Sequence, residues 1–192
     1  MPNFKAVIFD LDGTLVSSSL DFQLMRQQVG CPVAIDILQY VAQLPQAEQA
    51  NALEIIQQIE LDDAKTATVL PGAKALVEHL NQLNIPIAIV TRNFVKAARI
   101  KLDNNQLDIP FLITRDDAPA KPDPAGLLII AKEWNIAAED IIYIGDYLYD
   151  VQAANNAKMV SCLYAPDGLP EYADQADITC QHLDEIMQLI SG

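Results

Sequence analysis

The chain is poor in basic residues. Its 192 residues include 12 Lys and Arg against 26 Asp and Glu, which gives a formal net charge of −14. Nucleic-acid binding depends on clustered Lys and Arg that displace phosphate counterions, so we expect no nucleic-acid partner. The same charge repels phosphorylated molecules. A site for a phosphate ester would therefore need a metal ion and a well-placed Lys to overcome the overall field.

Long apolar runs and paired cysteines are also missing. The longest apolar stretches, such as residues 126–131, fall far short of the roughly 20 residues that a membrane span requires. The N-terminus leads directly into an apolar segment and lacks the pattern of a secretory signal. Cys31, Cys162 and Cys180 lie far apart without a C-x-x-C pair, which favours reduced structural thiols over a zinc site. We expect a soluble, cytoplasmic protein without a membrane partner.

Short apolar segments alternate with helical patterns along most of the chain. This alternation predicts an α/β fold, a Rossmann-like parallel sheet flanked by helices on both faces. In such sheets, ligands bind beyond the carboxyl ends of the strands, and Asp10, Thr91 and Asp146 each stand at the end of a candidate strand. The candidate strands are residues 5–9, 87–90, 111–113, 141–144 and 159–163, and the candidate helices are residues 72–81, 95–104, 124–134 and 150–156.

One region, residues 17–69, breaks the alternation. It contains no strand candidate, only helix-like segments at residues 22–29, 33–44 and 47–60. We predict a catalytic core made of residues 1–16 and 70–192, with residues 17–69 inserted as a small helical cap. The alternative for these helices is a packing role without contact to the chemistry.

The strongest chemical signal is Asp10-x-Asp12-Gly13-Thr14, directly after the first strand. An Asp carboxylate can attack phosphorus and form an aspartyl-phosphate. A second carboxylate two residues on points to the same side of an extended chain, where it can act as acid toward the leaving oxygen and then as base toward water. Gly13 would let the chain turn sharply away. A structural turn or a calcium loop is the alternative, although the residues that follow lack the further oxygen ligands of a calcium loop.

Three further candidate site motifs lie at the ends of predicted strands or ahead of a predicted helix. The motif Gly145-Asp146-x-x-x-Asp150 comes after the fourth strand, and its two Asp residues offer the carboxylates that Mg²⁺ prefers. Asp150 also suits the first turn of a helix. Lys121, ahead of a helix, would neutralise a nucleophilic carboxylate and an incoming phosphate. Thr91 would offer its hydroxyl to phosphate oxygens. Taken alone, Lys121 is typical of a surface position and Thr91 of a cap.

Taken together, these motifs resemble those of the haloacid dehalogenase superfamily. Its members carry a DxD after the first strand, a Ser or Thr after the second, a Lys, and a paired acidic motif after the fourth. The stretch FDLDGTLV at residues 9–16 is the most specific match. The insert between the first two motifs is similar to that of the helical-cap subgroup, which includes phosphoglycolate phosphatase-like enzymes and β-phosphoglucomutase.

The resemblance implies a Mg²⁺ site built from acidic residues. It makes Asp10 the nucleophile and a metal ligand, and Asp12 the acid/base whose backbone carbonyl also contacts the metal. It makes Asp146 a metal ligand and assigns Asp150 to the metal site, where it orients metal-bound water.

The resemblance also implies substrate contacts. Lys121 would hold the nucleophile and the phosphate, and Thr91 and its neighbour Arg92 would contact the substrate. Many relatives carry Thr-Asn-Lys where this chain has Thr-Arg-Asn, so the contacts next to Thr91 differ. Tyr147 and Tyr149 lie inside the paired acidic motif, and the resemblance assigns no role to either of them.

Hydrolysis of a small phosphorylated metabolite is the function that these residues favour. Dehalogenases of the superfamily lack the second Asp, so Asp12 favours phosphate chemistry. A phosphomutase of the β-phosphoglucomutase type and a non-catalytic protein that binds a phosphate ligand are the alternatives. Arg26, in the insert, is a candidate contact for a substrate carboxylate or second phosphate, or else an exposed helix charge.

Overall fold

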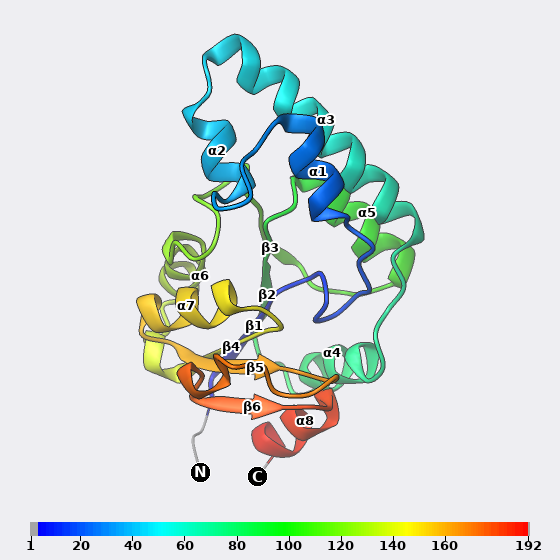
Figure 1. Ribbon diagram of the computed structural model, residues 1–192. Helices are drawn as coiled ribbons and strands as arrows, with labels where there is room; N and C mark the ends of the chain where they lie inside the picture. The colour runs from blue at the N-terminus through cyan, green and yellow to red at the C-terminus, as the bar shows by residue number, and fades with distance from the viewer. Residues whose placement is uncertain (1–3, 192) are drawn as a thin grey trace.

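The computed structural model describes residues 4–191 and is organised around one sheet (Figure 1). The strands lie in the order β3-β2-β1-β4-β5-β6, and every neighbouring pair is parallel. The predicted Rossmann-like α/β fold is therefore confirmed. The strands are β1 (Ala6–Phe9), β2 (Ile87–Val90), β3 (Phe111–Ile113), β4 (Ile141–Gly145), β5 (Val160–Tyr164) and β6 (Ile178–Cys180).

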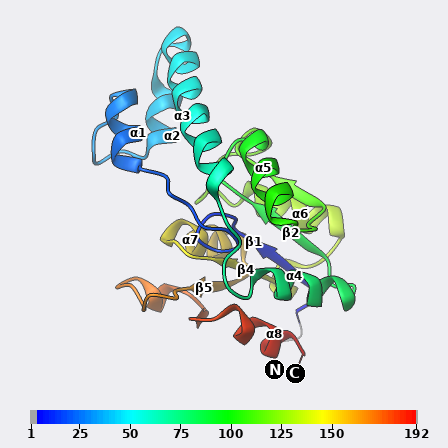
Figure 2. The ribbon, with the colours of Figure 1, turned by 90° about the vertical axis from the view of Figure 1, so that its right-hand side faces the viewer.

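Helices cover both faces of the sheet (Figures 1 and 2). Successive strand residues point to opposite faces, so Ala6 and Ile8 pack with one set of helices while Val7 and Phe9 pack with the other. Because both faces are buried, the strands are apolar throughout. The first set is α6 (Ala125–Trp134) and α7 (Leu148–Ala157); the second is α4 (Ala73–Gln82), α5 (Val95–Asn105) and α8 (Leu183–Ser191); two short 3-10 turns are Ala138–Asp140 and Ala173–Gln175.

The strand order explains where the site lies. β1 is central, and the chain continues from it to β2 and β3 on one side and to β4, β5 and β6 on the other. Ligands bind at the carboxyl edge of such a switch point. The register places Phe9 beside Ile89 and Ile144. The residues that follow these three strands therefore reach the same edge.

Three helices of the insert stand beyond that edge: α1 (Phe22–Val29), α2 (Ile37–Gln43) and α3 (Gln46–Thr66) (Figures 1 and 2). They have an apolar cluster of their own, centred on residues such as Met25, Val41 and Ile56. An antiparallel bridge between Val16 and Val69 joins the two chain segments that lead into and out of them. The helical insert is thus present, whereas the boundaries at residues 17 and 69 stay a prediction.

Several element boundaries differ from those expected. The second insert helix begins at Ile37 rather than Val33, because the Asp36 carboxylate accepts the backbone N–H groups of Leu38 and Gln39 and so caps the helix there. The third helix continues past Glu60 to Thr66, where its last turns pack on α5.

The last strand and the last helix were not predicted. β6 has only three residues, too few for a clear alternation, and it follows a turn-rich stretch. The apolar spacing of Leu183, Ile186 and Ile190 was a readable helical signal for α8. Within residues 4–191, no helix combines the length and the apolar character that crossing a bilayer demands.

Candidate active site

The site is built around the buried ammonium group of Lys121. Its Nζ atom lies 2.6 Å from Asp10 Oδ1 and 2.5 Å from Asp150 Oδ1, and it donates to the Tyr143 hydroxyl at 2.8 Å. Burial alone would lower the pKa of Lys121, but Asp10 and Asp150 outweigh burial and raise it. The ammonium therefore stays charged. Sequence reasoning missed Tyr143, although it is the one hydroxyl-bearing residue in an otherwise apolar strand.

Three carboxylates share this site. Oxygen atoms of Asp10, Asp146 and Asp150 lie within 4.8 Å of one another. When ionised, the three carboxylates exceed the single ammonium of Lys121 by two negative charges. One divalent cation would balance this excess. An all-oxygen donor set of this kind suits Mg²⁺, so the residues fit the metal that the sequence predicts. The Asp12 carboxylate lies outside this group.

Burial and mutual repulsion change the titration of these acids. Burial, followed by the charge of Asp150, raises the pKa of Asp146 to about 7, even though Lys121 acts in the other direction. The pKa of Asp10 is also raised well above its usual value, first by burial and then by the neighbouring carboxylates. A bound cation would relieve this repulsion.

The loop after β1 approaches Asp146 closely at Gly13. The φ angle of Gly13 is +77°, and a Cβ atom there would lie 2.2 Å from Asp146 Oδ2. The glycine therefore adopts a left-handed conformation at the sharp turn that the sequence predicts, and it leaves the space that the acidic cluster needs.

Asp150 combines two roles that the sequence left open. It lies in the first turn of α7, and its Oδ2 atom accepts the backbone N–H of Tyr147 at 3.0 Å. Its Oδ1 atom meanwhile accepts from Lys121 and contacts the Tyr143 hydroxyl at 2.9 Å. The helix start thus fixes one oxygen of Asp150, while the other faces the site.

The Asp12 carboxylate has two partners that sequence reasoning missed. Lys101 Nζ lies 2.5 Å from Asp12 Oδ1, and Asn93 Nδ2 lies 2.5 Å from Oδ2. Asn93 Nδ2 also donates to the Thr91 hydroxyl oxygen at 3.0 Å. A signal for Lys101 existed, because it shares the inward face of α5 with small and apolar residues such as Ala98.

A cavity of about 520 Å³ opens between this site and the insert helices. Asp10, Asp12, Thr91, Lys121 and Asp146 line its floor. The insert contributes a mainly apolar wall, whose members include Leu20, Phe22, Met25, Ile37, Leu38 and Ile56. A polar floor with a lysine and carboxylates below a mainly apolar wall suits a small organic phosphate.

A family model described as haloacid dehalogenase-like hydrolase matches residues 4–158. The chain belongs to this family. An uncharacterized hydrolase of Saccharomyces cerevisiae is 31% identical over 100% of this chain and 93% of its own length. A phosphoglycolate phosphatase of Pseudomonas savastanoi pv. phaseolicola is 28% identical over 98% of this chain and 79% of its own. The crystal structure of a hydrolase from Pseudomonas syringae has the same fold, with a TM-score of 0.81, 24% identity and coverage of 97% and 98%.

As a haloacid dehalogenase-like hydrolase similar to phosphatases, the chain is an enzyme of this class. Its insert helices correspond to the helical cap of the subgroup that the sequence indicates.

Arg92 connects this cap to the floor of the cavity. Its Nη2 atom lies 2.6 Å from Asp36 Oδ2 at the start of α2, and its Nη1 atom donates to the carbonyl oxygen of Lys121. The guanidinium also lies over the ring of Tyr149, 5.0 Å from its centroid. Arg92 lines the cavity, but its charge is already paired.

Arg26 and the two unassigned tyrosines also border the cavity of this hydrolase. Arg26 Nη1 donates to the carbonyl oxygens of Pro32, at 2.9 Å, and Ile35, so it holds a cap loop as well as lining the cavity. It is partly buried rather than a fully exposed helix charge. Tyr147 and Tyr149 lie edge to face, with ring centroids 5.3 Å apart, at the core side of the cavity.

The raised pKa of Asp146 predicts a pH-dependent stability. Because this pKa is about 7 in the folded chain against an ordinary 3.8, the folded state binds more protons between these values. The free energy of unfolding of the metal-free hydrolase should therefore fall as the pH rises from about 4 to 7. Melting temperatures in EDTA at pH 5 and pH 8 test this. Asp146→Asn should show a smaller fall, whereas Glu139→Gln, an exposed acid outside the site, should behave as wild type. Equal falls in all three proteins would contradict the assignment.

Proposed function

We propose that this chain hydrolyses a small phosphomonoester with Mg²⁺, through an aspartyl-phosphate on Asp10. The observation that carries the proposal is the 2.6 Å contact between Lys121 Nζ and Asp10 Oδ1 at the floor of a cavity, within a group of three carboxylates. The ammonium lowers the repulsion between the nucleophile and an incoming phosphate. The similarity to a phosphoglycolate phosphatase supports a small phosphorylated metabolite as substrate.

The reaction divides into two displacements at phosphorus. In the first, an Asp10 oxygen forms a bond to phosphorus, the ester P–O bond breaks, and the Asp12 carboxyl gives its proton to the leaving oxygen. In the second, water forms a bond to phosphorus and gives its proton to the Asp12 carboxylate. The bond between Asp10 and phosphorus then breaks, and orthophosphate leaves. Lys121 and the Thr91 hydroxyl hold phosphate oxygens in both steps.

Asp10, Asp146 and Asp150 would hold the Mg²⁺ ion, with the backbone carbonyl of Asp12 as a further oxygen ligand. When bound, the ion supplies positive charge that stabilises the transferring phosphoryl group. The protein's own part is to keep Asp150 in place through Lys121 and Tyr143, so that the acidic group is preorganised.

A screen of phosphorylated metabolites in the presence of Mg²⁺ tests the proposed function. We expect net release of orthophosphate from at least one small phosphomonoester, and loss of that release in EDTA. Exchange between isomeric sugar phosphates without orthophosphate would instead indicate a phosphomutase. Equilibrium binding without any turnover would indicate a binding protein. Either of these results would reject hydrolysis.

Arg26 gives the screen a specificity test. If its guanidinium contacts a carboxylate or second phosphate of the substrate, Arg26→Ala should raise KM for the best metabolite roughly tenfold, because a charge-assisted contact is lost. A minimal aryl phosphate should be unaffected. Gln28→Ala, at an exposed position of the same helix, serves as the control. Equal losses on both substrates would refute the contact and indicate that Arg26 only holds the cap loop.

A further inference from the structure

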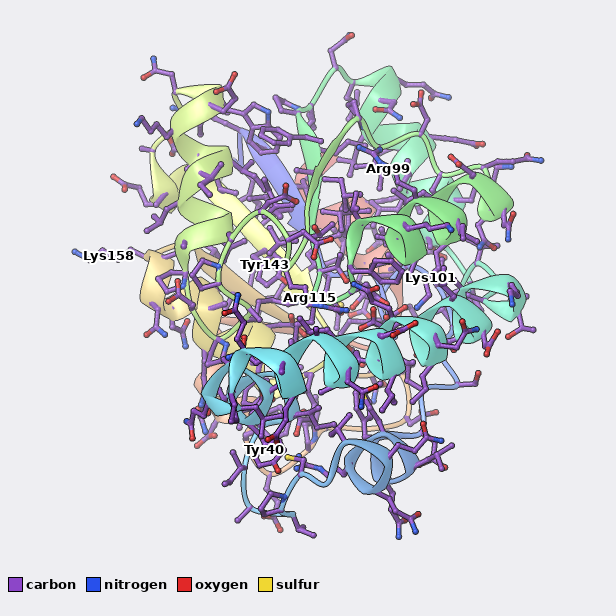
Figure 3. All side chains as sticks on the ribbon, turned by 90° about the horizontal axis from the view of Figure 1, so that it is seen from above. Tyr40, Arg99, Lys101, Arg115, Tyr143 and Lys158 are labelled. Carbon is purple, nitrogen blue, oxygen red and sulfur yellow. The ribbon has the colours of Figure 1, made fainter. Side chains whose placement is uncertain are left out.

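Lys101 is a fully buried cation that the proposed reaction does not yet use. It belongs to α5 of the core, and its side chain has 0% exposure. Its ammonium lies 2.5 Å from Asp12 Oδ1 and 2.7 Å from Asp63 Oδ2. Asp63 belongs to α3 of the insert, and Figure 3 shows Lys101 on the side of α5 that faces α3. A lysine is rarely buried unless it is paired, so these two carboxylates account for its position.

Asp63 is itself held firmly by the segment that leads into the insert. Its Oδ1 atom accepts the backbone N–H of Ser19 at 2.6 Å and the Ser19 hydroxyl at 2.9 Å. Its Oδ2 atom accepts the Ser18 hydroxyl at 3.2 Å and the ammonium of Lys101. These bonds fix the Asp63 carboxylate, which in turn anchors Lys101 from outside the loop that carries Asp12.

The orientation of Asp12 therefore depends on two neighbours. Lys101 holds one carboxylate oxygen, and Asn93 holds the other at 2.5 Å. Asp12 lines the cavity, whereas Lys101 lies behind it and does not. Lys101 can thus affect the reaction through Asp12 without touching the substrate. A general base must be aimed at the water that it deprotonates, and small misplacements reduce the rate strongly.

We propose that Lys101, anchored by Asp63, is a positioning residue that holds the Asp12 carboxylate in the orientation from which it takes the proton of the attacking water. This inference rests on the proposed function. The competing explanation is a structural one, in which the buried pair only fastens α3 to α5.

The molecule contains a matched pair with that structural role. Arg115 and Glu60 form another buried ion pair between the core and α3, with side-chain exposures of 7% and 6%. Arg115 also donates to the carbonyl oxygen of Arg92 at 2.8 Å, and it does not contact Asp12 or line the cavity. Glu60 does line the cavity, but neither residue of this pair is a hydrogen-bond partner of Asp12. Arg115→Met therefore removes a comparable fastening between α3 and the core and keeps the two side chains that hold Asp12.

Pre-steady-state kinetics with an activated aryl phosphate separate the two explanations. Its phenolate leaves without a proton, so formation of the aspartyl-phosphate does not need Asp12, whereas hydrolysis of that intermediate does. Lys101→Met should release about one equivalent of phenolate per enzyme in a rapid burst. Steady-state turnover should then be roughly 10- to 100-fold slower than that of wild type, because the base is misaligned. Asp12→Asn should show the same pattern in stronger form.

The structural explanation predicts a different result. Arg115→Met should lower burst rate and turnover by the same factor, and the same proportional loss in Lys101→Met would overturn the proposal. Wild-type kinetics in Lys101→Met would overturn it as well.

Asp63→Asn is the second variant if Lys101→Met does not fold. Its amide oxygen keeps the Ser19 bonds, but its NH₂ group faces Lys101, so we expect a burst followed by several-fold slower turnover. An unchanged ratio of burst rate to turnover would overturn the proposal. Absence of aryl phosphate turnover in the wild-type protein would instead reject the proposed function itself, which keeps the two failures distinct.

Discussion

Replacing Asp10 with Asn should reduce phosphate release in Mg²⁺ by about 10⁴-fold or more, because an amide cannot form the covalent intermediate. The fold should survive, since Asn has the same shape and the backbone N–H of residue 10 keeps its 2.8 Å bond to the carbonyl oxygen of Ile144. The amide also removes a carboxylate whose own pKa is raised well above its usual value by burial and by the charges of Asp150 and Asp146. In EDTA at pH 8, the melting temperature of Asp10→Asn should therefore equal or exceed that of wild type.

Activity and stability separate the nucleophile from other acids of the chain. Asp108→Asn, a matched substitution at an exposed position, should retain wild-type turnover. Magnesium-dependent turnover that survives Asp10→Asn would remove Asp10 from the role of nucleophile.

Replacing Lys121 with Met should lower both activity and stability. The substitution leaves Asp10 and Asp150 buried without their cation and deprives the Tyr143 hydroxyl of a donor. Breaking a buried ion pair by removing one partner costs about 3–5 kcal/mol of unfolding free energy. Loss of the charge beside the nucleophile should reduce kcat/KM roughly 10³-fold. Denaturant unfolding and steady-state phosphatase assays measure the two effects.

An exposed lysine provides the control for this prediction. Lys5 Nζ lies 2.7 Å from Asp140 Oδ2, a distance like those at Lys121, but the side-chain exposures are 61% and 31%. Lys5→Met should cost less than about 1 kcal/mol and leave activity intact, because water screens an exposed pair. Wild-type activity in Lys121→Met, or equal destabilisation by the two substitutions, would contradict the central position of Lys121.

The sequence was sufficient to place the acidic cluster at one edge of the sheet. Asp10 and Asp146 each follow a short apolar run, and the α/β alternation implies that parallel strands end at the same edge. The helical insert was recognisable because residues 17–69 contain helical patterns and no strand pattern. Boundaries were less accurate where a side chain decides the helix start, as Asp36 does for α2.

The partners of the predicted residues were not readable from the sequence. Lys101 of α5 and Asn93 of the loop after β2 contact Asp12, while Asp63 of α3 contacts Lys101. No local pattern specifies how these elements pack. Tyr143 was hidden in the same way, because its hydroxyl reaches Lys121 from the interior of a strand. Local patterns thus identify the residues that end strands, whereas the contacts that orient them depend on the packing of distant elements.

The most direct test of the mechanism is chemical trapping of the intermediate at residue 10. The protein is mixed with Mg²⁺ and an aryl phosphate, quenched in acid and reduced with borohydride, which converts an aspartyl-phosphate into homoserine. Peptide mass spectrometry then locates the modified residue. The mechanism predicts homoserine at position 10, dependent on substrate and absent in Asp10→Asn. Homoserine at another Asp, or phosphate release with no residue modified, would contradict it.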